Sequence, residues 1–171
     1  MRGNAALKAI RAIMAGHTRE AETDVDSLRA LAPHLFILDL GEGGPIYRLA
    51  GSAVQCAFGA DPRGRSYYEN WSRDARPALQ SFFHAAIESC CAFHVFSDGL
   101  WSWGTSARYE TVLIPVEIAA LRKNLFIGVN LLLDGDADSW RPAMLQHLRC
   151  IAFLHDGSRA PRRLYPRPVP V

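Results

Sequence analysis

The chain has 171 residues, of which 49% are hydrophobic and 21% are charged, and its formal net charge is +2. This length fits one domain, and such a domain buries enough surface to fold without a metal ion or a disulfide. The composition is that of a globular protein, and the small net charge gives no reason to expect a nucleic acid as partner.

The first 32 residues are expected to form a helical segment. Residues 5–15 carry one apolar stripe at helical spacing, made of Leu7, Ile10, Ile13 and Met14. A second short helix is expected from Val25 to Leu31, because Pro33 ends it.

The sequence predicts a cytoplasmic protein without a membrane span. Arg2, Lys8 and Arg11 interrupt the apolar pattern of the first residues, which is unlike a signal peptide, and no run of 18 apolar residues occurs. The four cysteines are therefore expected to be reduced thiols.

Residues 35–40 and 46–49 are short apolar runs that favour two buried strands, and residues 41–44 between them form a glycine-rich turn. This pattern predicts a hairpin. A short helix follows Gly51, then a loop over 59–64 and another short helical piece over 67–71.

The best helix of the chain is expected to begin after Asp74 as N-cap, with Pro77 in its first turn. One face of this helix is apolar and is expected to enter the core: Leu79, Phe83, Ala86, Ile87 and Cys90. His84 lies on the opposite face, which we expect to be solvated.

Three strands are expected over residues 92–103, 108–118 and 124–133. Pro115 cannot donate a ladder hydrogen bond, so a bulge is expected there. A final helix is expected over 139–153, with an apolar stripe of Trp140, Met144, Leu148 and Ile151.

These elements predict an α+β fold, with a five-stranded antiparallel sheet, helices on one face, and flanking N- and C-terminal helices. The expected organisation is a helical segment over 1–32, the sheet domain over 33–133, a C-terminal helix within 134–155, and a disordered tail over 156–171 that is rich in proline and arginine.

The order of these elements resembles the PAS fold, and three short motifs extend the resemblance. They are the strand end Tyr47-Arg48-Leu49-Ala50-Gly51, the loop G-(x)4-G-R-S over 59–66, and Tyr109-Glu110-Thr111-Val112-Leu113-Ile114-Pro115. Together they are similar to a single-domain PAS family common in alphaproteobacteria, over about residues 30–133. The resemblance implies a sensory or protein-interaction domain, with a pocket between the concave sheet face and the long helix.

Motifs for other chemistry are incomplete. Residues 59–66 resemble a P-loop, but Arg65 replaces its lysine and no strand precedes the loop. The run Asp134-Gly135-Asp136-Ala137-Asp138 resembles the start of an EF-hand loop, but Ser139 and Leu145 stand where glycine and glutamate are required. A connector loop and a polar turn are the favoured interpretations.

The cysteines and histidines leave weaker alternatives open. No C-x-x-C pair for zinc occurs, and Cys91 is a better candidate than Cys90 for a thiol sensor because it lies off the apolar helix face. His84 is a candidate haem ligand because the axial histidine of haem-binding PAS domains lies on the corresponding helix, although a histidine on a solvated face is usually a surface residue. His94 is a second candidate, on a strand that is expected to face the pocket.

Aromatic residues are concentrated in the sheet and the long helix, which indicates either a filled core or a partly open apolar pocket. The residues expected to line such a pocket are Phe83, Ile87, Trp103, Tyr109 and Asn130. The sequence thus favours a ligand-sensing module, not an enzyme, that forms a homodimer and signals through a protein partner. The alternatives are a ligand-free dimerisation module and, less favoured, a small α+β enzyme. The pattern names no cofactor.

Overall fold

The computed structural model describes residues 29–100, 106–118, 123–133 and 145–154. Its elements are, in chain order, η1 (Ala32–His34), β1 (Leu35–Gly41), β2 (Gly44–Ala50), α3 (Ser52–Phe58), α4 (Arg76–Ser89), β3 (Phe93–Leu100), β4 (Ser106–Ile118), β5 (Lys123–Leu132) and β6 (Leu145–Phe153).

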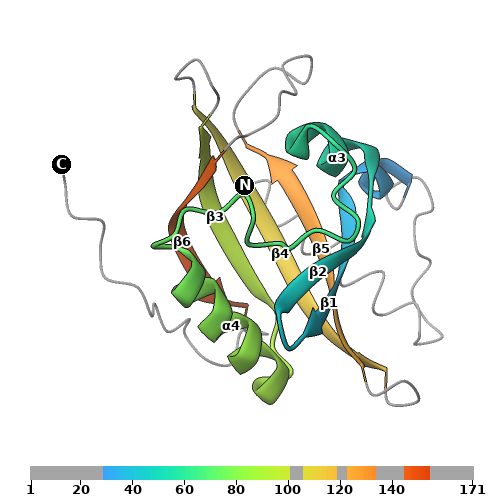
Figure 1. The fold of residues 1–171 in the computed structure, drawn as a ribbon, viewed down its shortest axis with the longest axis vertical. Helices are drawn as coiled ribbons and strands as arrows, with labels where there is room; N and C mark the ends of the chain where they lie inside the picture. Colours follow the sequence, from blue (N-terminus) through green and yellow to red (C-terminus); the bar gives the residue numbers. More distant parts are fainter. Residues whose placement is uncertain (1–28, 101–105, 119–122, 134–144, 155–171) are drawn as a thin grey trace.

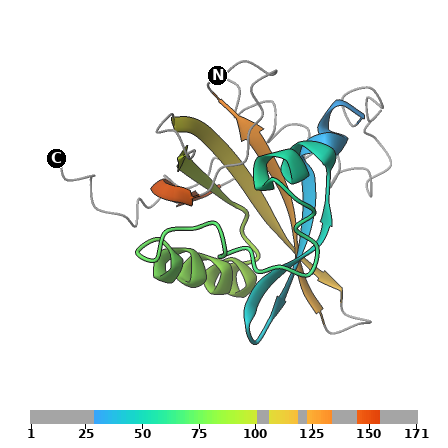
Figure 2. The ribbon, with the colours of Figure 1, turned by 45° about the horizontal axis from the view of Figure 1, so that its top comes forward.

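The strands form one antiparallel sheet in the order β2-β1-β5-β4-β3-β6. Helices α3 and α4 lie on the same face, which Figure 1 shows in front of the sheet, and Figure 2 shows α4 beside that face from another angle. The predicted α+β class and the antiparallel sheet are confirmed, with six strands in place of five.

The face below the helices carries the main core. Strand alternation directs Phe36, Leu38, Leu113 and Phe126 to this inner face, and each is at most 1% exposed. The opposite, outer face is also apolar, because Val112, Ile114 and Val129 are buried there.

Gly128 lets β5 pass beneath the ring of Phe36. A Cβ atom at Gly128 would overlap that ring. Both residues sit in the registered pair between β1 and β5, so neither backbone is free to move away. The close approach of ring and backbone therefore requires glycine.

A segment between α3 and α4, here called the strap (residues 64–72), crosses the inner face from one sheet edge to the other (Figure 1). At the β2 edge, the Tyr67 N–H donates to the carbonyl of Pro45 (2.8 Å), and the Gly64 N–H donates to the carbonyl of Tyr47 (2.9 Å). The positive φ of Gly64, +81°, suits the turn that starts this pairing.

At the other edge the strap meets β6. The Gln146 N–H donates to the carbonyl of Asn70 (2.6 Å), and the Ser72 N–H donates to the carbonyl of Gln146 (2.9 Å). The strap thus closes the open side of the sheet, and it covers backbone groups of both edge strands that would otherwise be unpaired.

Both edge strands also contain a bulge that adds an arginine. In β2 the extra residue is Arg48, which donates two hydrogen bonds to Asp39 Oδ2 on β1, the shorter at 2.9 Å. In β6 it is Arg149, whose Nε donates to Asp98 Oδ2 on β3. Each bulge is thereby tied to the neighbouring strand by an ion pair.

The helix expected over 139–153 was wrong over its second half, because β6 occupies Leu145–Phe153 and pairs with β3. The bulge at Arg149 explains the error. Leu148 and Ile151 both face the core, but the extra residue separates them by three positions, a spacing that in a regular sequence indicates a helix.

Three smaller expectations were also wrong. No bulge occurs at Pro115, because β3 begins opposite Leu113, and β4 has no strand partner on that side beyond this point. Residues 67–71 form turns and an isolated bridge to β6 instead of a helix. Cys90 is exposed, because α4 ends at Ser89 and Cys90 turns away in a left-handed conformation (φ 52°).

Part of the predicted organisation lies outside the described residues: the stripe over residues 5–15, Trp140, Met144 and the tail over 156–171. Residues 29–31, the end of the second expected helix, are helical. Within the described ranges, no helix is long and apolar enough to cross a membrane.

We predict that Gly128→Ala destabilises the fold by about 3 kcal/mol, since a methyl group there displaces the Phe36 ring from a close-packed core. Urea unfolding followed by tryptophan fluorescence measures the change. Gly43→Ala is the matched control, because a Cβ atom at Gly43 has open space. An equal loss in both variants would contradict the packing argument, as would a full Gly128→Ala cost in a Phe36→Leu background.

Candidate ligand-binding site

Phe83 of α4 is the centre of the inner aromatic cluster. Its ring makes edge contacts with Phe126 (4.8 Å between centroids), Phe93 (5.3 Å) and Tyr67 (5.5 Å). Such edge-to-face contacts are favourable and directional. They hold α4 and the strap in fixed positions above the sheet.

Polar groups lie beside this aromatic cluster, at the strap. The Tyr67 hydroxyl is buried next to the Trp71 indole and the Thr111 hydroxyl, but it meets hydrogen-bond geometry with no group in the described residues. Burial and the neighbouring Tyr47 raise the pKa of Tyr67 well above its ordinary value, so this hydroxyl keeps its proton.

The Thr111 hydroxyl donates to Asn130 Oδ1 at 2.9 Å, across the register pair of β4 and β5. On β3, the Ser97 hydroxyl is 1% exposed and lies 3.4 Å from Gln146 Oε1 of β6. Alternation places Ser97, Thr111 and Asn130 on the inner face. They form a neutral polar patch beneath the strap.

Buried charges lie on the other side of the sheet. Among the described residues, the buried acidic side chains are Asp39 and Glu110, and alternation directs both to the outer face. The interior therefore offers aromatic surface and uncharged hydrogen-bonding groups. Such an environment favours a neutral ligand over a charged one, because burying a charge without a partner costs free energy.

The residues expected to line a pocket fall at different places in the interior. Phe83 lies in the aromatic cluster and Ile87 is half-buried one turn later on α4. Tyr109 packs with Ala57 of α3, while Asn130 belongs to the polar patch. Trp103 lies outside the described residues.

Tyr67 joins these groups, and the sequence interpretation missed it. Its ring touches Phe83 and its hydroxyl lies beside Thr111, the partner of Asn130. Thr111 could have been found from the sequence, since it lies two residues after Tyr109 on the same strand and therefore on the same face. Tyr67 could not, because the pairing of the strap with both sheet edges is long-range.

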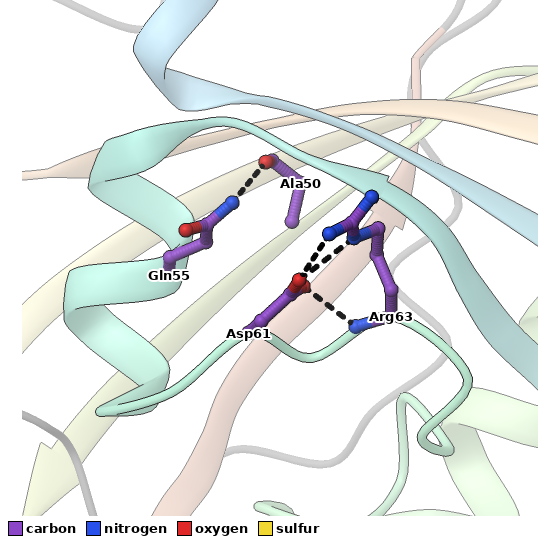
Figure 3. A network of polar contacts seen from close by, with 4 residues as sticks. All are labelled: Ala50, Gln55, Asp61 and Arg63. Carbon is purple, nitrogen blue, oxygen red and sulfur yellow. Dashed lines mark hydrogen bonds and ion pairs between the residues drawn. The ribbon is translucent and has the colours of Figure 1, made fainter.

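Two pockets lie away from this interior. An open pocket of about 390 Å³ beside α3 is lined in part by Gln55 and Asp61. Figure 3 shows that Gln55 Nε2 donates to the Ala50 carbonyl (2.9 Å) and that Asp61 pairs with Arg63 (2.6 Å). These polar groups already have protein partners, so the pocket leaves none of them needing a ligand.

The second pocket, of about 160 Å³, lies where the end of α4 meets the hairpin of β4 and β5, and Cys90 is part of its wall. The Cys90 thiol is directed to the Ile87 carbonyl at 3.7 Å, and the Cys91 thiol to the Ser89 carbonyl at 3.3 Å. Both thiols therefore interact weakly with the end of the helix.

The candidate haem ligands do not face the interior. His84 is exposed, as predicted, and His94 lies on the outer face opposite Val112. The suggestion that His94 faces the pocket was therefore wrong, since Phe93 and Val95 take the inner positions. The described residues hold no group of three or more histidine, cysteine, aspartate or glutamate side chains arranged for a metal ion.

On the outer face, His94 Nδ1 lies 3.9 Å from Glu110 Oε1. Burial raises the pKa of Glu110 and lowers the pKa of His94, because it disfavours the charged form of each group. A raised carboxyl pKa stabilises the fold at low pH, and this contribution is lost as pH rises past the ordinary glutamate value, 4.5, and through the raised pKa.

We therefore predict that Glu110→Gln stabilises the fold by about 1 kcal/mol at pH 7.5, the scale of a buried polar group that lacks full pairing. The gain disappears near pH 4, where the Glu110 carboxyl is largely protonated. Urea unfolding at both pH values measures this. Glu69→Gln is the control, and it is expected to lower the stability at pH 7.5, because the partner Arg65 lowers the pKa of Glu69. A loss of stability in Glu110→Gln at pH 7.5 would contradict the prediction.

Comparison with known proteins gives a family and a set of similar folds. A sequence model described as a PAS domain matches residues 11–131. No curated protein matches the sequence. A Light-Oxygen-Voltage domain studied with a flavin analogue superposes with a TM-score of 0.50 at 13% identity, over 66% of this chain and 85% of its own.

VqmA of Vibrio cholerae, in a complex with ligand and DNA, has a TM-score of 0.50 at 15% identity over 66% of this chain. An RNA-binding Light-Oxygen-Voltage receptor has a TM-score of 0.48 at 18% identity over 68% of it. The aligned region spans 51% of VqmA and 35% of the RNA-binding receptor. At these identities the likeness concerns the fold alone.

Proposed function

Because the chain belongs to the PAS domain family, which its sequence matches over residues 11–131, we propose that it is a sensory domain whose interior binds an uncharged small molecule. The observation that carries the proposal is the Tyr67 hydroxyl, which is buried and lacks a hydrogen-bond partner among the described residues. A buried donor left unpaired costs the fold about 1–3 kcal/mol, and a ligand acceptor would remove that cost.

The neighbours of Tyr67 support the kind of ligand. Phe83 and Trp71 supply apolar surface, while Thr111 and Asn130 supply neutral hydrogen-bonding groups. An apolar site with a few convergent polar groups is the usual form of a small-molecule site. The proposed lining is therefore Tyr67 and Thr111 together with the residues expected from the sequence: Phe83, Ile87, Trp103, Tyr109 and Asn130. The response is proposed to leave through a protein partner.

Mass spectrometry of the purified protein, native against denatured, tests the ligand. We expect the native mass to exceed a whole multiple of the chain mass, and Tyr67→Phe to lose the excess because the proposed donor is gone. Tyr68→Phe is the matched control, because the Tyr68 hydroxyl is also buried without a hydrogen-bond partner among the described residues and burial raises its pKa to about 12, while the interaction with Thr111 is that of Tyr67. Retention of the excess mass by Tyr67→Phe, or its absence from the wild-type protein, would overturn the proposed site.

The stability of Tyr67→Phe gives an independent measurement on ligand-free protein. Without a ligand, loss of the unpaired hydroxyl is expected to raise the free energy of unfolding by about 1 kcal/mol. Urea unfolding of protein refolded from denaturant measures it. A loss of stability instead would mean that the hydroxyl is already satisfied in the empty protein, which contradicts the basis of the proposal.

A second candidate function is a ligand-free homodimerisation module, and the apolar stripe of residues 5–15 is the feature that favours it. Leu7, Ile10, Ile13 and Met14 form one apolar face at helical spacing, and such a face needs a surface to cover it. On the outer face of the sheet, Leu31 and Leu154 already pack against Val112 and Val129, so these valines are covered within the chain itself. The stripe is therefore proposed to join two copies of the chain.

Removal of residues 1–16 tests this second candidate. If the stripe joins two copies, the full chain is a dimer by light scattering and the truncated chain is a monomer at the same concentration. Substitution of Leu7 and Ile10 by glutamine is the control that keeps the chain length. An unchanged oligomeric state in both variants would reject a role of this stripe in dimerisation.

A further inference from the structure

Gln146 connects the C-terminal strand to the strap. Its backbone N–H and carbonyl bond to Asn70 and Ser72 of the strap, and its side-chain oxygen lies 3.4 Å from the Ser97 hydroxyl in the interior. On its other side it pairs with Gly99 of β3. We propose that the occupant of the interior controls how firmly β6 is held on the sheet, and that the strap carries this effect through Gln146. This inference rests on the proposed ligand site and assigns its output.

The strap links the interior to β6 over a few residues, so a displacement of one of its side chains reaches β6 directly. Tyr67 presents its hydroxyl to the interior, and Trp71 forms the bridge opposite Gln146, with its ring 5.9 Å from that of Tyr67. Trp71 is 2% exposed and packs in the core cluster. A guest that moves the Tyr67 or Trp71 side chain therefore moves the same few residues that bond to β6.

Strand β6 is the element of the sheet best suited to respond. It is an edge strand with one strand neighbour, its ladder is interrupted at Arg149, and it lies outside residues 11–131 that match the family. Its outer edge is covered by the strap at Gln146. Edge elements with few partners open at lower free energy than the centre of a sheet.

Packing ties β6 to the long helix as well. Phe153 stacks on Phe82 of α4 at 4.8 Å between centroids and lies 6.3 Å from Phe93. Release of β6 uncovers these rings on the protein surface. Loosening at Gln146 would thus change an apolar surface at the end of the described chain, which a protein partner can distinguish.

Hydrogen–deuterium exchange with peptide mass spectrometry tests the coupling in the full chain, without added ligand. We predict that Trp71→Phe raises the exchange rate of β6 amides about tenfold relative to β1 amides. Phe126→Leu is the control, since it shrinks a ring of the same core on β5 whose ring contacts among the described residues are with Phe83 and Phe93. An equal ratio of β6 to β1 exchange in the two variants would overturn the proposal, because it would mean global unfolding only.

Coupling must also act in reverse, since linkage is reciprocal. Phe153→Leu, which loosens β6 from α4, is predicted to raise the exchange rate of the strap amides relative to β1 amides. If this ratio stays unchanged, the proposal is overturned, and this test remains available even if Trp71→Phe fails to fold. Neither measurement depends on a ligand, so an absent mass excess would reject the proposed function while leaving this coupling separately tested.

Discussion

The hydrogen bonds of the strap to both edges of the sheet are the constraint on which the interior depends. Three of these bonds hold residues 64–67 to β2, and two hold residues 70–72 to β6 through Gln146. Without them, the inner face between α3 and α4 would be open, and Tyr67 and Trp71 would have no fixed position. With them, an open six-stranded sheet encloses its core much as a closed barrel does, although the closing segment is not a strand.

Elements whose signal is local could be predicted from the sequence. The hairpin of β1 and β2, the alternation of β5 and the buried face of α4 follow from periods of two and 3.6 residues. Strand β6 could not, because one extra residue at Arg149 changes its period. His94 was misassigned because a one-residue choice of phase moves a strand residue to the other face.

The candidate site divides in the same way. Alternation brought Tyr109 and Asn130 to the inner face, and helical spacing brought Phe83 there. The meeting of Tyr67 with Thr111 could not be read from the sequence, because it depends on a pairing between the strap and two strands that are about 100 residues apart in the chain. Neutral polar side chains buried in an aromatic core lower the stability of the fold unless they are fully paired. Their presence beside Tyr67 is the reason for choosing this place as the candidate site.

The two arginine bulges have a consequence for the behaviour of the protein at high concentration. Arg48 and Arg149 are more than half exposed and stand at the two places where another chain would otherwise extend the sheet. A bulge spoils the flat template for an incoming strand, and a charge there opposes its desolvation. Self-association through strand edges, the first step toward fibrils, is thereby disfavoured at both ends, and contacts between copies are directed to the faces of the sheet.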